Sequence, residues 1–225
     1  MKVKLDKVTK KFGQIVALDD ISFEVNKGDF VFITGKSGAG KSTVIALILA
    51  EIKPTQGEVW VNDLLLNKAR SGKLLILRRQ IGVIYQDFRL LANKTVKENI
   101  TVALEVAGYK EGDWREKLNQ VLETVSLGER SELFPSQLSG GELQRACLAR
   151  ALAINPKMVI ADEPTGNLDP ETIWQFMGLL NSVNELGVTV IMATHNFDIV
   201  NSMGRRVIRL DQGKLISDKK KGKYE

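Results

Sequence analysis

The sequence is poor in residues that form covalent cross-links. Its 225 residues include a single cysteine, Cys147, which cannot form a disulfide within the chain. We therefore expect a reducing compartment. A chain of this length buries roughly 70% of its extended surface without disulfides or metals, so it should fold on its own core.

Long apolar runs are also absent. The longest, residues 44–50, has seven members, whereas a helix that spans a bilayer needs about 20. The start of the chain, MKVKLDKVTKK, lacks the apolar core of a signal peptide. A hydrophobic content of 44% with 26% charged residues is ordinary for a soluble globular protein. Neither a transmembrane helix nor a signal peptide is expected.

The net charge is modest at +5, and part of it lies in the segment 216–225. The lysines that cluster there are Lys219, Lys220, Lys221 and Lys223. We interpret this segment as a solvated basic tail, with contact to anionic lipid as the alternative. Aromatic residues do not interleave with the basic ones, as a stacking surface for nucleic acid would require, so no nucleic-acid partner is expected.

The order of local patterns predicts an α/β protein. Short β-type runs separated by turns fill the first third and suggest small antiparallel pieces around one buried strand, 30–34. The middle, 87–155, is helical, and strands separated by helices return in the last third. This alternation predicts a mostly parallel central sheet, interrupted by an inserted helical subdomain.

A phosphate-binding loop is the strongest motif. GKSGAGKST matches the pattern G-x-x-x-x-G-K-[ST] directly after the strand at 30–34 and directly before a predicted helix. Its backbone N–H groups and the helix N-terminus suit phosphates, Lys41 would reach the β and γ phosphates, and the Ser42 hydroxyl would bind Mg²⁺. The alternative is a Gly/Ser-rich connector. The predicted ATP-binding residues of the loop are Gly35, Lys36, Ser37, Gly38, Ala39, Gly40, Lys41, Ser42 and Thr43.

Three polar residues follow other predicted strands. Asp162, at the end of MVIAD, would bind Mg²⁺, and Glu163 would act as the general base that polarises the attacking water. Gln86, after GVIY, would complete the Mg²⁺ shell with its amide oxygen and bind ATP. The alternative is that the two acids cap neighbouring loops.

The one histidine, His195, follows the strand-like run VTVIMAT. At the end of a strand it could donate a hydrogen bond to the γ-phosphate, and we count it with Glu163 and Lys41 as catalytic. The alternative is a packing role. Cys147 lies on the apolar face of a predicted helix without a neighbouring base, so we expect it to pack in the core.

The order of GKSGAGKST, YQD, LSGGELQR, MVIADEPTGNLD and ATHN resembles the ATP-binding subunits of ABC transporters. The resemblance implies a P-loop NTPase with a RecA-like sheet, an N-terminal antiparallel β subdomain and an inserted helical subdomain. It implies one domain over 1–225, with a nucleotide-binding core at 1–86 and 156–215 and a helical signature subdomain at 87–155.

The same resemblance implies that two chains form a head-to-tail homodimer around two ATP molecules. Each ATP would be held by the P-loop of one chain and the LSGGE turn of the other. The residues expected at this interface are Ser139, Gly140, Gly141, Glu142 and Asp169. The resemblance also implies that Phe12 stacks on adenine and that Val16 contributes to ATP binding.

Within this family, LRRQIGVIYQDFRLLANKTVKENI resembles the FtsE group of cell-division ATPases. That resemblance implies an FtsX-like integral membrane partner, a peripheral position on the cytoplasmic face of a bacterial membrane, and a role in activating cell-wall hydrolases. The predicted partner groove, between the sheet core and the helical insert, is lined by Phe88, Arg89, Leu90 and Leu91. The alternative is that the two leucines pack the helical insert.

Other functions share these motifs. An ATPase subunit of a lipoprotein-release or macrolide-type exporter is the main alternative. A soluble ABC protein acting on DNA or ribosomes is less expected, because the chain has neither a second cassette nor a long coiled-coil insert. A regulator that binds ATP without hydrolysing it is disfavoured by the presence of Lys41, Asp162, Glu163 and His195.

Overall fold

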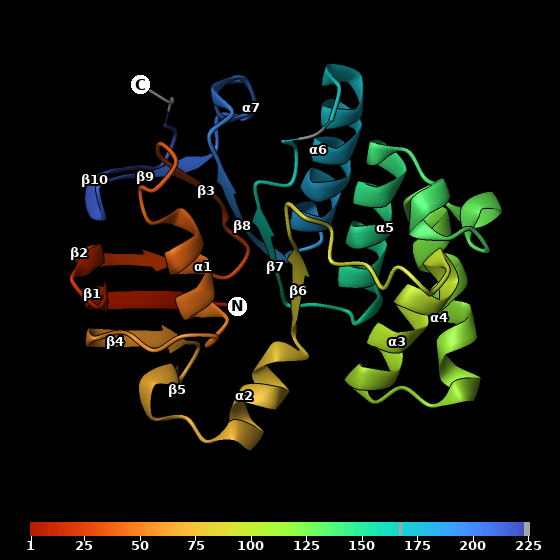
Figure 1. Cartoon of the computed structure of the whole chain (residues 1–225), viewed down its shortest axis with the longest axis horizontal. Coiled ribbons are helices and arrows are strands. Elements are labelled where there is room, and N and C mark those ends of the chain that lie inside the picture. The colour runs from red at the N-terminus through yellow and green to blue at the C-terminus, as the bar shows by residue number, and fades with distance from the viewer. Residues whose placement is uncertain (167, 223–225) are drawn as a thin grey trace. The chain divides into compact units, whose positions relative to one another are not determined.

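The computed structural model describes residues 1–166 and 168–222, with the backbone alone for residues 111 and 113. The chain divides into two compact units (Figure 1). The first unit combines Met1–Arg78 with Gly187–Glu225, and the second is Arg79–Leu186.

An antiparallel sheet forms the N-terminal part of the first unit. Its strands are β1 (Val3–Phe12), β2 (Ile15–Val25), β4 (Gln56–Val61) and β5 (Leu64–Leu65), in the order β2-β1-β4-β5. In β1, Val3 and Leu5 are buried while Lys4 between them is exposed, which is the alternation of a sheet with one solvated face. The predicted antiparallel β subdomain is confirmed.

Among the described residues, a second, mainly parallel group of strands and four helical segments form the rest of this unit. Strands β3 (Phe30–Thr34), β8 (Thr189–Thr194) and β9 (Arg206–Asp211) run parallel, with β3 in the middle, and β10 (Lys214–Lys219) pairs antiparallel with β9. Every residue of β3 and β8 is buried, as expected of strands covered on both faces. The helices of the unit are α1 (Lys41–Ile48), α2 (Ser71–Arg78), α7 (Phe197–Met203) and the 3-10 turn η1 (Leu66–Lys68).

Strand β10 corrects the predicted basic tail. Residues 216–219 belong to this strand, and Lys219 pairs with Val207. Arg206 holds the strand with two bonds to the Asp218 carboxylate, Nε to Oδ1 at 2.8 Å and Nη2 to Oδ2 at 2.7 Å. The hydrogen bonds to Asp218 raise the pKa of Arg206. The described part of the tail is therefore 220–222, and Lys223 lies outside the described residues.

The second unit is built on two parallel strands, β6 (Ile81–Ile84) and β7 (Met158–Asp162). Its helices are α3 (Val96–Ala107), α4 (Glu111–Thr124), α5 (Gly140–Ala153) and α6 (Pro170–Glu185), with the 3-10 turns η2 (Gly128–Arg130) and η3 (Pro135–Gln137). Helix α5 lies between β6 and the helices α3 and α4 (Figure 1). The unit thus holds strands and α6 as well as the helical segment 87–155, and the predicted domain boundaries stay a prediction.

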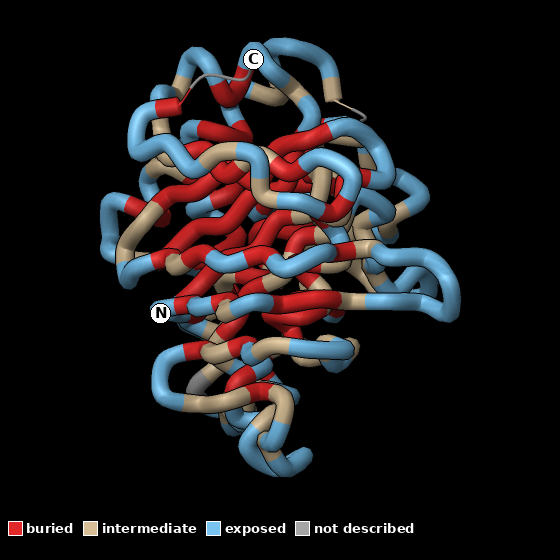
Figure 2. Tube along the Cα trace, turned by 90° about the vertical axis from the view of Figure 1, so that its left-hand side faces the viewer, coloured by how far each residue is buried: buried red, intermediate tan, exposed pale blue. Residues whose placement is uncertain are grey.

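Burial follows the strands in both units. Figure 2 shows buried residues along the strands and exposed residues along loops and outer helix turns. Among the described residues, every helix is too short or too polar to cross a membrane.

Strand β6 and helix α5 pack closely at Gly82. A Cβ atom on Gly82 would lie 2.6 Å from the Ala151 carbonyl oxygen. We therefore expect Gly82→Ala to lower the free energy of unfolding by about 1–3 kcal/mol, because the helix must move away from the strand.

Gly178→Ala, in the exposed middle of α6, is the matched control. Its Cβ would meet no atom within 4 Å, so alanine should raise stability by up to about 1 kcal/mol through helix propensity. Chemical denaturation of both variants is the measurement. Equal stability of Gly82→Ala and the parent chain would contradict the packing.

Candidate functional site

The P-loop joins β3 to α1 in the first unit, and its glycines are required by its shape. Gly35 and Gly40 have φ of 149° and 104°, values that residues with a Cβ rarely adopt. A Cβ on Gly35 would also clash with the Leu210 carbonyl oxygen, and one on Gly40 would lie 2.7 Å from Leu18 Cδ2. The loop is thus tightly enclosed by β2 and β9.

The turn between β9 and β10 supports the loop from behind. The Gly213 N–H donates to the Ala39 carbonyl at 3.2 Å, and the Gly213 carbonyl accepts from the Asp19 N–H at 2.8 Å. These bonds tie the P-loop to both neighbouring strands, so its backbone is fixed before any ligand arrives.

Lys41 and the start of α1 make the loop suitable for an anion. Lys41 is 7% exposed, and its Nζ donates to the carbonyls of Gly35 at 2.8 Å and Lys36 at 3.2 Å. Helix α1 starts at Gly40 without a side-chain cap and without an acid in its first turn. Its first N–H groups and the lysine together present positive charge to the loop. Ser42 is exposed on the same turn.

The pairing register of β3 and β8 places His195 at the edge of the sheet where the P-loop begins. Thr34 of β3 pairs with Thr194 of β8 in parallel, so Gly35 and His195 each follow the paired residue. His195 is exposed. The first unit therefore brings the P-loop and His195 together as predicted from the strand ends.

Phe12 and Val16 lie at the β1–β2 hairpin of this unit. They are 48% and 44% exposed, which is unusual for apolar side chains. Phe12 pairs with Ile15, and Lys10 Nζ lies 4.7 Å from the centre of the Phe12 ring. Since the next residues of β2 adjoin Gly40 of the P-loop, both residues belong to the part of the hairpin next to the loop, and the Phe12 ring is of the kind that stacks on an adenine ring.

The predicted acid pair lies in the second unit at the end of β7, and Gln86 follows the neighbouring strand β6. Ile84 pairs with Ala161, so Gln86 and Asp162 follow at the same edge. A Cβ on Gly166 would lie 3.5 Å from Gln86 Nε2, and the Gly166 N–H donates to the Glu163 carbonyl at 3.4 Å. The turn after the acids thus folds back over Gln86.

Glu163 has a left-handed backbone, with φ of 47°. Such strain in a residue with a side chain persists only where the surroundings enforce it, and it is frequent at functional sites. Glu163 and Asp162 are both half-buried. The Asp162 carboxylate and the Gln86 amide are hard oxygen donors of the kind that Mg²⁺ prefers, as is the Ser42 hydroxyl of the first unit.

The LSGGE turn begins helix α5 with a capping box. The backbone N–H and the Oγ of Ser139 each donate to Glu142 Oε2 at 2.8 Å, and the Glu142 N–H donates to Ser139 Oγ at 3.3 Å. The bonds from Ser139 lower the pKa of Glu142, and the nearby Arg130 contributes to the same shift. The glutamate is therefore ionised at neutral pH.

Asp169 lies beside this turn. A Cβ on Gly141 would lie 2.6 Å from Thr172 Cγ2, and Thr172 donates to the Asp169 carboxylate from its N–H at 3.0 Å and its Oγ1 at 2.5 Å. Thr172 lowers the pKa of Asp169 through these bonds. The second unit thus brings the predicted interface residues together on one side.

The family model described as ABC transporter matches residues 18–166. The chain belongs to the ABC transporter family.

Relatives match over almost the whole chain. The cell division ATP-binding protein FtsE of Mycobacterium tuberculosis is 47% identical and that of Bacillus subtilis is 44% identical, covering 100% and 99% of this chain and 98% of each relative. The methionine import ATP-binding protein MetN of Carboxydothermus hydrogenoformans is 40% identical over 91% of this chain and 61% of the relative.

Among solved structures, the dimeric post-hydrolysis state of the ATP-binding cassette MJ0796 bound to ADP and Pi superposes with a TM-score of 0.89. It is 36% identical and covers 99% of this chain and 100% of that one. The α/β P-loop fold of the family, with its antiparallel and helical parts, is thereby confirmed.

In this ABC family chain, the predicted partner residues form a strained segment after β6. Phe88 and Arg89 both have a left-handed backbone, with φ of 60° and 49°. Arg150 on α5 donates from Nη2 to the Phe88 carbonyl at 3.0 Å and from Nη1 to the Arg89 carbonyl. The bonds from α5 hold the segment in this shape.

Asn99 on α3 fixes the other end of the segment. Its Oδ1 accepts from the Leu91 N–H at 2.7 Å, and its Nδ2 donates to the Leu91 carbonyl at 3.1 Å. Leu91 is 42% exposed, whereas Leu90 is half-buried. Neither Arg150 nor Asn99 was identified from the sequence. Arg150 contacts a segment about sixty residues away, and no motif marks Asn99, which lies eight residues after Leu91. The role of Phe88–Leu91 as a partner groove stays a prediction.

Cys147 also contacts this segment, with its Sγ donating to the Phe88 carbonyl at 3.2 Å. The side chain is buried, as predicted, and burial raises its pKa to about 12. At pH 8 only about one thiol in ten thousand would be ionised.

We therefore expect Cys147 to resist alkylation by iodoacetamide at pH 8 in the folded protein and to react fully in denaturant. Mass spectrometry reports this residue alone, because the chain has one cysteine. Alkylation of the folded chain at the rate of a free thiol would contradict the burial.

Proposed function

We propose that this chain is an ATP-hydrolysing ABC subunit that dimerises around two ATP molecules and drives an integral membrane partner in cell division. The observation that carries the proposal is the full-length match to FtsE proteins at 44–47% identity. The wider role, activation of cell-wall hydrolases, belongs to the same proposal.

ATP binding begins at the P-loop. The loop N–H groups and the N-terminus of α1 would receive the phosphates, and Lys41 would turn from its carbonyl partners toward the β and γ phosphates. The exposed Phe12 and Val16 would contact the adenine ring. These roles rest on residues that the first unit already brings together.

Ser42, Gln86 and Asp162 would hold Mg²⁺, whose charge offsets that of the phosphates. Glu163 would orient a water molecule and accept its proton as the water attacks the γ-phosphate. His195 would donate a hydrogen bond to a γ-phosphate oxygen. The strained backbone of Glu163 supports a positioned side chain.

The signature turn would act on the second chain of the dimer. Ser139, Gly140 and Gly141 would contact the γ-phosphate bound to the partner's P-loop, and Asp169 would meet its counterpart. The dimeric cassette MJ0796 with ADP and Pi supports this arrangement by analogy.

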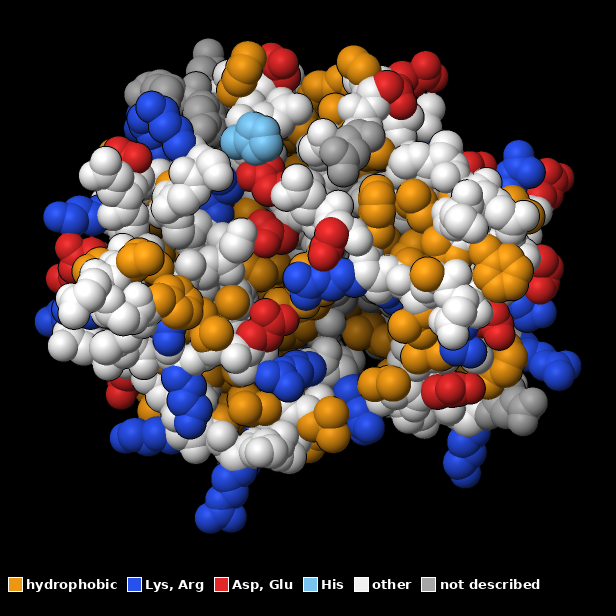
Figure 3. Space-filling model, in the orientation of Figure 1, with side chains coloured by type: hydrophobic (Ala, Val, Ile, Leu, Met, Phe, Trp, Pro, Cys, Tyr) orange, Lys and Arg blue, Asp and Glu red, His pale blue; other side chains and the backbone are white. Residues whose placement is uncertain are grey.

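The membrane partner would be FtsX-like and would dock at Phe88–Leu91, with this chain peripheral on the cytoplasmic face. A nucleic-acid partner is not proposed, because on the face drawn in Figure 3 basic side chains are interspersed with acidic ones rather than forming one continuous band.

A lipoprotein-release or macrolide-type exporter subunit is less favoured. The FtsE relatives match at higher identity and over a larger share of their own length than the transport ATPase MetN does. Mass spectrometry of the membrane protein that co-purifies with the native chain separates the two functions.

Glu163→Gln tests the hydrolytic mechanism. Since the amide cannot accept the proton, we expect turnover to fall at least about 100-fold while ATP still binds and the dimer accumulates. Phosphate release and light scattering measure the two effects. Glu105→Gln replaces an exposed acid on α3 and should leave turnover and dimer formation unchanged. Normal turnover in Glu163→Gln would remove Glu163 from the mechanism.

Leu91→Asp tests the docking segment. Leu91 is exposed in this chain, and docking of the partner would bury it. A charge at this position should therefore abolish co-purification of the membrane partner, because an apolar anchor of the complex is lost. Leu186→Asp, at an 85% exposed leucine, is the matched control and should retain the partner. Nucleotide binding by both variants shows that they are folded, and retention of the partner by folded Leu91→Asp would rule the segment out.

A further inference from the structure

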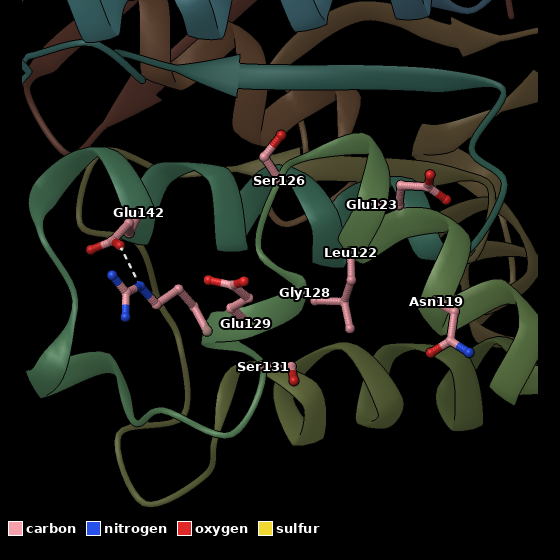
Figure 4. A pocket seen from close by; sticks show the side chains of 9 residues that line it. Asn119, Leu122, Glu123, Ser126, Gly128, Glu129, Ser131 and Glu142 are labelled. Atoms are coloured by element: carbon pink, nitrogen blue, oxygen red, sulfur yellow. Dashed lines mark hydrogen bonds and ion pairs between the residues drawn. The ribbon is translucent and has the colours of Figure 1, made fainter.

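Arg130 contacts the signature turn but belongs to none of the motifs above. It ends the 3-10 turn η2, and its Nε lies 3.2 Å from Glu142 Oε1. The Glu142 side chain is 20% exposed and that of Arg130 54% exposed. Both residues line a depression between the end of α4, η2 and the start of α5, and the dashed line in Figure 4 marks the ion pair.

The backbone that carries Arg130 is firmly held. The Lys97 N–H donates to the Ser131 carbonyl at 2.9 Å, and the Val96 N–H donates to the Leu133 carbonyl at 2.9 Å. These bonds fasten the segment after η2 to the first turn of α3. Arg130 therefore approaches Glu142 from a fixed base, although its own side chain is largely exposed.

Arg130, Glu142 and Ser139 form a chain of contacts. Glu142 Oε2 accepts both bonds from Ser139, while Oε1 faces Arg130. The arginine thus binds the oxygen that the serine leaves free. In this arrangement the Ser139 hydroxyl proton is directed to Glu142.

This arrangement creates a conflict for a phosphate ligand. Under the proposed function, the γ-phosphate of the partner's ATP approaches the same helix N-terminus that already holds the Glu142 carboxylate. Two anions at one helix end repel each other. The Ser139 hydroxyl must also turn from the carboxylate to the phosphate. A cation on the far oxygen of Glu142 reduces the repulsion and keeps the carboxylate in place while the hydroxyl turns.

We propose that Arg130 is a positioning residue of the signature turn, which neutralises Glu142 so that the Ser139 hydroxyl can donate a hydrogen bond to the γ-phosphate bound by the opposite chain. The inference rests on the proposed ATP-dependent dimer. It assigns a role outside the LSGGE motif, to a residue that acts through Glu142 and does not itself contact the nucleotide.

The test measures the ATP concentration at which half of the chains are dimeric, by light scattering in the Glu163→Gln background. Arg130→Ala should raise this concentration about two- to tenfold, as expected for a partly exposed charge pair next to an anion. Binding of a fluorescent ATP analogue to the monomer should not change. Arg130→Lys should restore part of the loss, because it keeps the charge without the planar guanidinium.

Lys97→Ala is the matched control. This substitution removes an ion pair of the neighbouring segment, in which the exposed side chains of Lys97 and Glu132 lie 3.0 Å apart. It should leave unchanged the ATP concentration at which half of the chains are dimeric. Thermal unfolding of both variants separates a folding defect from an effect on the turn.

A double-mutant cycle tests whether Arg130 acts through the charge of Glu142. In a Glu142→Gln background there is no carboxylate charge to neutralise, so Arg130→Ala should raise the midpoint much less than in the parent. An equal effect in both backgrounds, or no effect in a parent that dimerises, would overturn the inference. A parent that stays monomeric at saturating ATP would overturn the proposed function itself, and the role of Arg130 would fall with it.

Discussion

Hydrogen bonding between parallel strands positions the polar residues of both units. Thr34 pairs with Thr194 in one unit and Ile84 with Ala161 in the other. Because paired parallel strands finish at one edge, the residues that follow them are brought close by the strand pairing itself. Every residue of β3 and β8 is buried, so these two strands belong to the core that supports this edge.

Two helix N-termini in the chain are built in opposite ways. Helix α1 begins at a glycine without a capping side chain and adds a lysine, so its N–H groups are available to an anion. Helix α5 begins with a serine and a glutamate that cap each other. The second helix therefore already carries a negative group where a phosphate would bind. Under the proposed function, this difference would suit the LSGGE turn to a ligand that another P-loop holds, and not to a phosphate by itself.

The sequence predicts local features well and distant contacts poorly. The P-loop is readable because its glycines, lysine and serine are adjacent and meet the steric needs of one turn. The capping box at Ser139 and Glu142 is equally readable, because it follows the local pattern S-x-x-E. Strand β10 was missed because Arg206 and Asp218 must meet across a turn. The bonds from Arg150 to the carbonyls of Phe88 and Arg89 span about sixty residues, and no spacing rule reveals them.

Helix α5 relates the signature turn to the strained segment. It starts at the Ser139 cap and carries Arg150 near its other end, roughly 16 Å away at the rise of an α-helix. Arg150 supports two left-handed residues that each store strain of about 1–3 kcal/mol. A ligand that pulls Phe88 and Arg89 out of this shape must break the bonds to α5 or move the helix. Since a packed helix moves as a rigid element, displacement at one end shifts the LSGGE turn at the other.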